Sequence, residues 1–235
     1  MTELLYLKNH YLKEFKAIVT EVLEENEIIL DQTNFYYTSG GQPSDLGKII
    51  KDNKEFQVLN VRKEQGKIIH EVNLNGLQRG DKIRGIIDWK RRYQLMKSHT
   101  AAHIISEVIH KETGALITGN QIDIGKTRID FALDEFSKEK MQKYIDQANE
   151  IINKDLPISI EFITKGQAEK MPQISKLAMG LPSFINEIRI VRIGGFDMQA
   201  DGGTHVHSTK EIGKIELVKT ENKGKNNRRM YFKVV

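Results

Sequence analysis

Residues 88–114 read DWKRRYQLMKSHTAAHIISEVIHKETG, and the hydrophobic pattern of the chain changes at this stretch. Before it, apolar and polar residues alternate in short segments, as they do in half-buried strands. Within it, apolar residues recur at helical spacing, at Leu95, Ala102, Ile105 and Ile109. The pair Thr113-Gly114 is a typical C-terminal stop. The stretch therefore predicts a helix over residues 91–112.

The part of the chain before this helix carries alternating segments separated by turns rich in Asn, Gly and Asp. They lie at residues 17–22, 27–30, 47–51, 55–62, 67–72 and 81–87. Short strands joined by tight turns are typical of a small barrel. We expect residues 1–88 to form an N-terminal β-barrel domain.

The part after the helix mixes helical and strand patterns. Ser137 is the expected N-cap of a second helix that runs to Lys154, and Pro157 returns the chain to an extended conformation. Strands are expected at residues 121–133, 158–163, 188–193, 211–220 and 230–235, with a short helix at 167–169. The predicted fold class is α+β, in which residues 89–235 pack helices on a largely antiparallel sheet.

Composition excludes several kinds of chemistry. The chain has 235 residues, a formal net charge of +4 and no cysteine. Disulfide scaffolds, iron–sulfur clusters and thiol nucleophiles are thereby excluded, and a metal ion would have to be held by His, Asp or Glu. No run of about 18 apolar residues is present, and charges interrupt the N-terminus where a signal peptide needs its apolar stretch. We expect a cytoplasmic protein.

His99 and His103 lie four residues apart on the predicted helix, so their imidazoles stack on one face. This spacing lets two histidines bind one metal ion, although it also arises in helices that bind none. Ser98, Ala101 and Ala102 favour the metal interpretation, because small residues let another element approach the same face.

Residues 194–205 read GGFDMQADGGTH and place Asp201 and His205 among two Gly-Gly pairs. Paired glycines permit tight turns and close backbone approach. We expect a loop here that brings His205 and a carboxylate to the helical histidines, a nitrogen and oxygen set suited to zinc. His207 is an alternative to Asp201 as the fourth group, because it points to the same side as His205 if the chain is extended.

Residues 33–47 read TNFYYTSGGQPSDLG and have two interpretations. One is a turn-rich connection inside the barrel. The other is a recognition loop, in which backbone N–H groups and the side chains of Thr33, Thr38 and Gln42 contact a ligand.

Together these segments resemble a known family. The loop at 33–47, SHTAAH at 98–103, QADGGTHV at 199–206 followed by Glu211-Ile212-Gly213, and Lys223-Gly224-Lys225 with Arg228-Arg229 occur in the same order as in freestanding alanyl-tRNA editing proteins of the AlaX type. The resemblance covers nearly the whole chain. In its length and its glycine-rich N-terminal part, the chain is similar to the medium-sized class of these proteins. The resemblance extends to the editing domain of alanyl-tRNA synthetase.

The resemblance implies a metal-dependent aminoacyl-tRNA deacylase that hydrolyses the ester of tRNA(Ala) mischarged with serine, and also with glycine. It also implies one zinc ion, held by the paired helical histidines, a cysteine and the histidine four residues after it. His99, His103 and His205 carry over directly, but Asp201 stands where the family has cysteine. Three arrangements stay open: Asp201 as ligand, a water as ligand with Asp201 behind it, or a site that has lost its metal.

The remaining roles follow from this resemblance and from chemistry. A pocket for alanine cannot strongly exclude glycine or serine, so a second sieve is needed. We expect Thr33 with Gln42 to contact the serine hydroxyl, and Gly40 and Gly41 to let backbone approach the aminoacylated end. The residues expected to bind tRNA phosphates are Lys90, Arg91, Arg92, Lys223, Lys225, Arg228 and Arg229. For each of these the alternative is a solvated surface charge.

Two other functions compete with this one. A zinc hydrolase could act on a different aminoacyl ester, and a tRNA-binding module without catalysis could remain if the metal site decayed with the cysteine.

Overall fold

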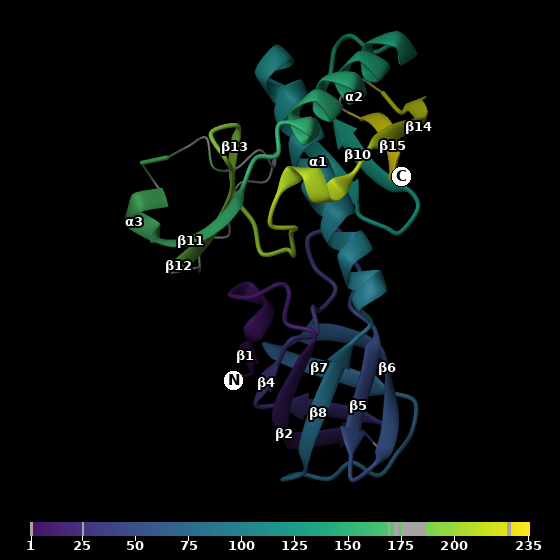
Figure 1. Cartoon of the computed structure of the whole chain (residues 1–235), viewed down its shortest axis with the longest axis vertical. Coiled ribbons are helices and arrows are strands. Elements are labelled where there is room, and N and C mark those ends of the chain that lie inside the picture. The colour runs from purple at the N-terminus through teal and green to yellow at the C-terminus, as the bar shows by residue number, and fades with distance from the viewer. Residues whose placement is uncertain (1, 25, 169, 172–173, 175–186, 225–226) are drawn as a thin grey trace. The chain divides into compact units, whose positions relative to one another are not determined.

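The computed structural model describes residues 2–24, 26–168, 170–171, 174, 187–224 and 227–235. The chain divides into two compact units, Met1–Gln94 and Leu95–Val235. The division falls within helix α1 (Trp89–Thr113), which occupies the stretch where the sequence predicted a helix (Figure 1). Among the described residues, no helix combines the length and apolar character needed to span a bilayer.

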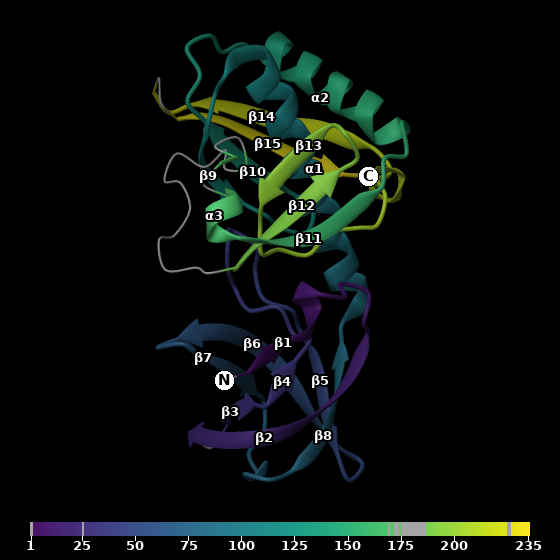
Figure 2. The same ribbon diagram turned by 90° about the vertical axis from the view of Figure 1, so that its left-hand side faces the viewer.

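The first unit is a closed six-stranded barrel, as the sequence predicted (Figure 2). The order around the barrel is β2 (Glu14–Glu24), β3 (Glu27–Leu30), β7 (Lys67–Val72), β6 (Lys54–Glu64), β5 (Gly47–Lys51) and β8 (Lys82–Ile87). Alternate residues point inward, so Phe15, Ala17 and Val19 of β2 enter the core while their neighbours face outward. Burial of this apolar face is the main stabilising contribution to the barrel.

Three short elements of this unit were not predicted. Strand β1 (Glu3–Leu4) pairs in parallel with β4 (Gln32–Thr33), and a 3₁₀ turn follows β1 at Leu5–Leu7. Each is too short for an alternating pattern to be visible in the sequence.

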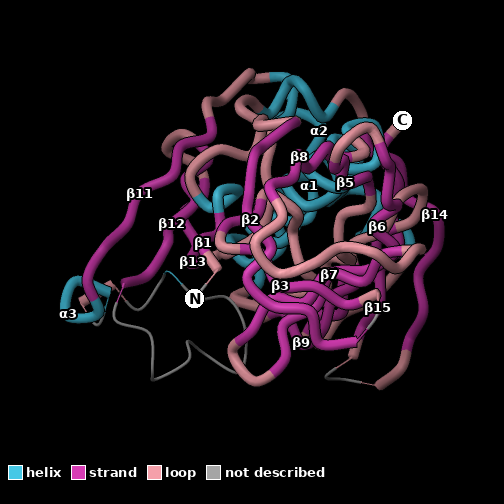
Figure 3. The backbone as a smooth tube through the Cα atoms, turned by 90° about the horizontal axis from the view of Figure 1, so that it is seen from below, coloured by secondary structure: helices cyan, strands magenta, loops and turns pink. Residues whose placement is uncertain are grey.

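The second unit is α+β, as predicted. A four-stranded antiparallel sheet has the order β14 (Ile215–Asn222), β15 (Arg228–Val234), β10 (Thr127–Phe131) and β9 (Ile117–Gln121). A second sheet has the order β11 (Ile158–Thr164), β12 (Glu187–Ile193) and β13 (Asp197–Ala200), and α3 (Lys165–Ala168) follows β11 (Figure 3). Residue 169, the expected end of the short helix, lies outside the described residues.

Helix α2 (Lys138–Asn153) runs along the larger sheet beside β14 (Figure 2). The side chain of Ser137 accepts a hydrogen bond from the Lys140 backbone N–H at 3.1 Å, which confirms it as the N-cap. One face of the helix is buried, at Met141, Tyr144, Ile145, Ala148 and Ile152. These are the positions that helical periodicity predicted.

The strand segments expected within 121–133 are the end of β9 and all of β10. Two other predictions in the second unit differ from the structure. The segment expected to be an irregular loop contains β13, which pairs with β12. The first residues of 211–220 belong to a 3₁₀ turn (Thr209–Ile212), because the side chains of Ser208 and Glu211 form a capping box there.

Arg92, in the first turn of α1, is fully buried within the barrel unit. Its Nε donates to Asp45 Oδ1 at 2.9 Å, its Nη1 to the carbonyl of His10 at 3.0 Å, and its Nη2 to the carbonyl of Asn34 at 2.6 Å. Asp45 in turn accepts a hydrogen bond from the Tyr36 backbone N–H at 2.7 Å. The assignment of Arg92 to RNA binding was therefore wrong, because the side chain has no exposed surface to offer a phosphate.

We expect Arg92→Met to destabilise the barrel by about 3–5 kcal/mol, because it leaves the Asp45 carboxylate buried without its cation. Urea unfolding followed by tryptophan fluorescence measures this. Trp89 is the one tryptophan of the chain and packs on Tyr93 and Tyr11 in the same unit. Arg84→Met is the matched control, because the Arg84 pair with Glu14 is exposed and is worth about 1 kcal/mol or less. Equal losses for the two variants would contradict the structural role of Arg92.

His70 lies in the barrel interior with its Nε2 2.9 Å from the Thr33 hydroxyl oxygen. Burial lowers the pKa of His70 to about 4, because the imidazolium would lose its hydration. The folded protein therefore keeps this ring neutral at pH values where the unfolded chain already binds a proton. Barrel stability should consequently fall as the pH drops from about 6.5 to about 4.

We expect His70→Gln to flatten the pH dependence of stability in this window. The unfolding free energy of the wild type should fall more steeply, by up to about 1.4 kcal/mol per pH unit, which corresponds to one proton. Urea titrations at several pH values measure both slopes, and other histidines contribute equally to the two proteins. Parallel curves would show that His70 is not held neutral.

Candidate metal centre

Four side chains converge in the second unit. Helix α1 contributes His99 and His103, and the segment after β13 contributes Asp201 and His205. Each offers one ligand atom, and these atoms all lie within 4.8 Å of one another. The structure thus brings together the four residues that the sequence analysis grouped.

The distances show how close the groups are. His205 Nε2 lies 2.8 Å from Asp201 Oδ2, and His99 Nε2 lies 3.6 Å from Asp201 Oδ1. The ring centroid of His205 is 4.6 Å from that of His99 and 4.8 Å from that of His103. Three imidazoles and one carboxylate therefore surround one small space.

Gly203 is the residue that allows this approach. A Cβ atom at Gly203 would lie 2.1 Å from His99 Cε1, so no other residue fits without moving the ring. The backbone N–H of Gly203 also donates to Asp201 Oδ2 at 2.6 Å, which orients the carboxylate. The sequence predicted a close backbone approach at the Gly-Gly pairs, and the backbone of Gly203 makes this approach to the His99 ring.

The Thr100 hydroxyl contacts the ring of His205 and favours one of its two neutral tautomers. The Thr100 hydroxyl donates its one proton to the Met96 carbonyl at 2.9 Å, and its oxygen lies 3.1 Å from His205 Nδ1. That contact is favourable when Nδ1 carries the ring proton and donates it to Thr100. In this tautomer the Nε2 lone pair faces Asp201 Oδ2 at 2.8 Å and is free to bind a cation, whereas in the other tautomer Nε2–H donates to that oxygen.

Other buried polar groups surround the cluster. The carboxylate of Asp197 lies 3.4 Å from His103 Nδ1 and accepts a hydrogen bond from Gln199 Nε2 at 2.9 Å. Arg189 Nη1 donates to the Asp201 backbone carbonyl at 2.6 Å and lies 3.9 Å from Oδ2. Such neighbours fix the rings and carboxylates of metal ligands.

Sequence reasoning assigned no role to Thr100, Gln199 or Arg189. One signal was present, because Thr100 lies inside the SHTAAH motif between the two histidines. Gln199 and Arg189 face the cluster only because β13 pairs with β12, and that pairing was not predicted.

The pKa shifts of His99, Asp201 and His205 favour the forms that bind a metal. Burial lowers the pKa of His99 to about 4, and burial also holds the pKa of His205 well below its ordinary value, against the opposing effect of Asp201. Burial alone would raise the pKa of Asp201, but the adjacent His99 and His205 hold it well below its usual range. Neutral imidazoles and an ionised carboxylate are the forms that bind a cation.

His207 is not a fourth member of this set. His205 is fully buried, but His207 is exposed and lies outside the cluster. The chain turns towards the 3₁₀ element instead of continuing as a strand, so the two side chains do not share one side. Among the open alternatives, the geometry favours Asp201.

The expected serine-binding residues lie in the barrel unit. Thr33 and Gln42 are both fully buried. The Thr33 hydroxyl contacts His70 and accepts a hydrogen bond from the Phe35 backbone N–H at 3.1 Å, so it serves the barrel interior. Gly40 and Gly41, by contrast, are exposed and adopt φ angles of 57° and 82°, which only glycine adopts readily.

The residues expected to bind RNA differ in their surroundings. Lys90 is exposed, and Arg91 is half-buried and donates to the Ser44 carbonyl at 3.3 Å. Lys223 is exposed and lies 3.4 Å from Glu221. Arg228 donates to the Leu133 carbonyl at 3.1 Å, and Arg229 pairs with both oxygens of Asp130 at 2.7 and 3.0 Å. Lys225 lies outside the described residues.

Two family matches cover different parts of the chain. Residues 5–91 match the class II (A) tRNA synthetases, and residues 188–231 match the second additional domain of threonyl and alanyl tRNA synthetases. The second match contains Asp201 and His205.

Relatives match over the full chain. The alanyl-tRNA editing protein AlaX-M of Methanosarcina barkeri is 47% identical over 100% of both chains. AlaX-M of Saccharolobus solfataricus is 44% identical over 100% of this chain and 99% of its own. The alanine–tRNA ligase of Methanococcus maripaludis is 34% identical over 94% of this chain but only 24% of the ligase.

We expect Thr100→Val to weaken metal binding by about 10- to 100-fold, because His205 loses the acceptor that fixes its tautomer. Thr100→Ser keeps the hydroxyl and should bind like the wild type. Thr113→Val is the matched control, because Thr113 donates to the Ile109 carbonyl at 2.7 Å in the same helix, away from the cluster. Titration with zinc against a competing chelator gives the affinities. An unchanged affinity in Thr100→Val would remove Thr100 from the site.

Proposed function

The chain belongs to the alanyl-tRNA editing proteins of the AlaX-M type, and from that premise we propose that it hydrolyses the ester bond of tRNA(Ala) mischarged with serine or glycine. The observation that carries the proposal is the buried cluster of His99, His103, Asp201 and His205. We further propose that the cluster binds one zinc ion.

Action in trans is supported by how the relatives align. The editing proteins match from end to end, whereas the ligases match over about a quarter of their length. We propose that the chain, which matches about a quarter of the ligase, acts on charged tRNA that a separate ligase has released. Charged tRNA is used in the cytoplasm, so the proposal places the protein there.

The donor set fits zinc. Imidazole nitrogens and a carboxylate oxygen are ordinary zinc ligands, and three neutral ligands with one anion leave the same net charge as three histidines with a thiolate. Asp201 therefore preserves the charge of the cysteine that it replaces. When bound, zinc would supply a Lewis acid that polarises the ester carbonyl or orients the ribose and the amino group.

The protein's own residues hold and shield this site. The side chains of His99, His103 and His205 are 5%, 9% and 0% exposed, whereas that of Asp201 is 18% exposed. Substrate would approach on the Asp201 side. The burial of the imidazoles keeps bulk water from competing for the cation and strengthens electrostatic stabilisation of the oxyanion that forms on the ester carbonyl.

An aminoacyl ester is labile, so positioning a water and stabilising the tetrahedral oxyanion are sufficient chemistry. The alcohol that leaves is the terminal ribose hydroxyl, and the amino acid leaves as the acid. For Thr33 and Gln42 we propose a contact to the serine hydroxyl only if substrate reaches their side chains, which are buried in the barrel. Gly40 and Gly41 are proposed to let the aminoacylated end approach the backbone, and Lys90, Arg91 and Lys223 to contact RNA phosphates.

We expect the purified protein to deacylate Ser-tRNA(Ala) and Gly-tRNA(Ala) and to spare Ala-tRNA(Ala). A chelator should lower the rate by about 10²-fold or more, because the site loses the cation that would polarise the ester carbonyl or orient the substrate, and zinc should restore it. Asp201→Ala should behave like the chelated protein, and Asp201→Cys should keep metal and activity. Rates with each charged tRNA, alongside metal content, measure all of these.

Different outcomes contradict different parts of the proposal. Activity that resists chelation and Asp201→Ala would remove zinc from the mechanism. Equal rates on unrelated aminoacyl-tRNAs would indicate a general esterase. Binding of tRNA(Ala) without any deacylation would indicate a non-catalytic module.

A further inference from the structure

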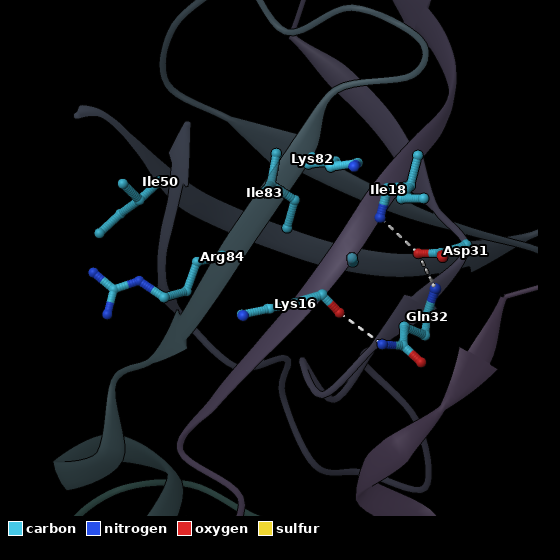
Figure 4. Close-up of a pocket in the computed structure, with 9 residues that line it drawn as sticks. Lys16, Ile18, Asp31, Gln32, Ile50, Lys82, Ile83 and Arg84 are labelled. Carbon is cyan, nitrogen blue, oxygen red and sulfur yellow. Dashed lines mark hydrogen bonds between the residues drawn. The ribbon is translucent and has the colours of Figure 1, made fainter. Parts of the chain in front are cut away.

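The barrel carries a groove of about 540 Å³ on its outer surface (Figure 4). It lies over β2, β8 and β5, and the pairing of these strands fixes its side chains in rows. Lys16 of β2 is directly opposite Arg84 of β8, and Ile18 is opposite Lys82. Ile50 of β5 is opposite Arg84 on the other side. Three cations therefore project from two adjacent strands.

Like charges directly opposite each other on neighbouring strands destabilise a sheet. Arg84 is partly compensated, because its Nη1 lies 3.1 Å from Glu14 on the exposed face. Within the described part of the chain, no ion pair or hydrogen bond is formed by the side chains of Lys16 and Lys82. Both lysines are exposed, so packing of the sheet does not require cations at these positions. The barrel nevertheless keeps Lys16 opposite Arg84, where the two like charges repel.

Other lysines of the first unit form ion pairs with acidic residues. Lys8 pairs with Glu3 at 3.1 Å, Lys51 with Asp81 at 2.8 Å, and Lys67 with Glu21 at 2.8 Å. Lys13, Lys54 and Lys63 lie over aromatic rings instead, so the groove lysines differ from these six in having neither an acid nor a ring beside them among the described residues.

The acidic residue of the groove does not neutralise them. Asp31 Oδ1 accepts hydrogen bonds from the backbone N–H groups of Ile18 at 2.7 Å and Gln32 at 2.8 Å. Gln32 in turn donates from Nε2 to the Lys16 carbonyl at 2.6 Å, which ties β4 to the groove wall. The groove is net positive, with aliphatic surface from Ile18 and Ile50 between the cations.

We propose that this groove binds the phosphate backbone of tRNA, with Lys16, Lys82 and Arg84 on the phosphates and the isoleucines against the sugars. The inference rests on the proposed function for the choice of RNA as the anion. Charge complementarity carries it, because cations at neighbouring positions of two paired strands, two of them without an acid partner, suit a polyanion with regularly spaced charges. It also accounts for RNA contacts that the buried Arg92 and the acid-paired Arg229 do not provide.

The test compares two double variants with the same change in net charge. Lys16→Gln with Lys82→Gln alters the groove, and Lys8→Gln with Lys67→Gln alters lysines of the same unit that already pair with glutamates. Binding of uncharged tRNA(Ala) to the full chain is followed by fluorescence anisotropy at several salt concentrations. The groove variant should bind about 10-fold more weakly near 0.1 M salt, and its salt dependence should be shallower by about one to two phosphate contacts. The control should change by less than about 3-fold.

Equal weakening of the two variants would overturn the proposal, because it would reduce the effect to net charge. Unchanged binding by the groove variant would also overturn it. Competition by a polyglutamate as effective as that by RNA would assign the groove to an acidic protein segment instead. Because the ligand is uncharged tRNA, failure of deacylation would refute the proposed function without affecting this test.

Discussion

Four ligand atoms of His99, His103, Asp201 and His205 lie within 4.8 Å of one another in the second unit, and their lone pairs repel where no proton or cation lies between them. Burial removes the water that would otherwise screen the repulsion. The surroundings nevertheless hold the groups in place, because Thr100 and Gly203 fix the orientation of His205 and Asp201. A cluster held in this way could bind a cation.

The same physics produces a different result in the barrel unit. There Arg92 supplies the positive charge itself, and Asp45 with two backbone carbonyls satisfies it completely. Nothing is left for a ligand, so the group is structural. The two sites show that burial of charge does not indicate function by itself. What distinguishes the cluster is that three imidazoles and a carboxylate place their ligand atoms around one small space.

Periodicity was sufficient for the long elements. The barrel strands, α1 and α2 follow from alternation or helical spacing, and the paired histidines follow from α1. Motif order grouped Asp201 and His205 with them. The burial of Arg92 could not be predicted, because Lys90, Arg91 and Arg92 form one run of basic residues in the sequence. Only the tertiary position of Asp45 distinguishes Arg92 from its two neighbours. Strand β13 was missed because its four residues lie between Gly-Gly pairs that indicate a loop. Thr33 was misread for a related reason, since a polar turn residue gives no sign of a buried histidine opposite it.

The account depends most directly on which atoms hold the metal. X-ray absorption spectroscopy of the zinc-loaded protein reports the ligands and their distances without reference to activity. The account predicts four nitrogen or oxygen ligands at about 2.0–2.2 Å, with scattering from three imidazoles, and loss of one oxygen ligand in Asp201→Ala. A spectrum with fewer than three imidazoles, or one that Asp201→Ala leaves unchanged, would contradict it.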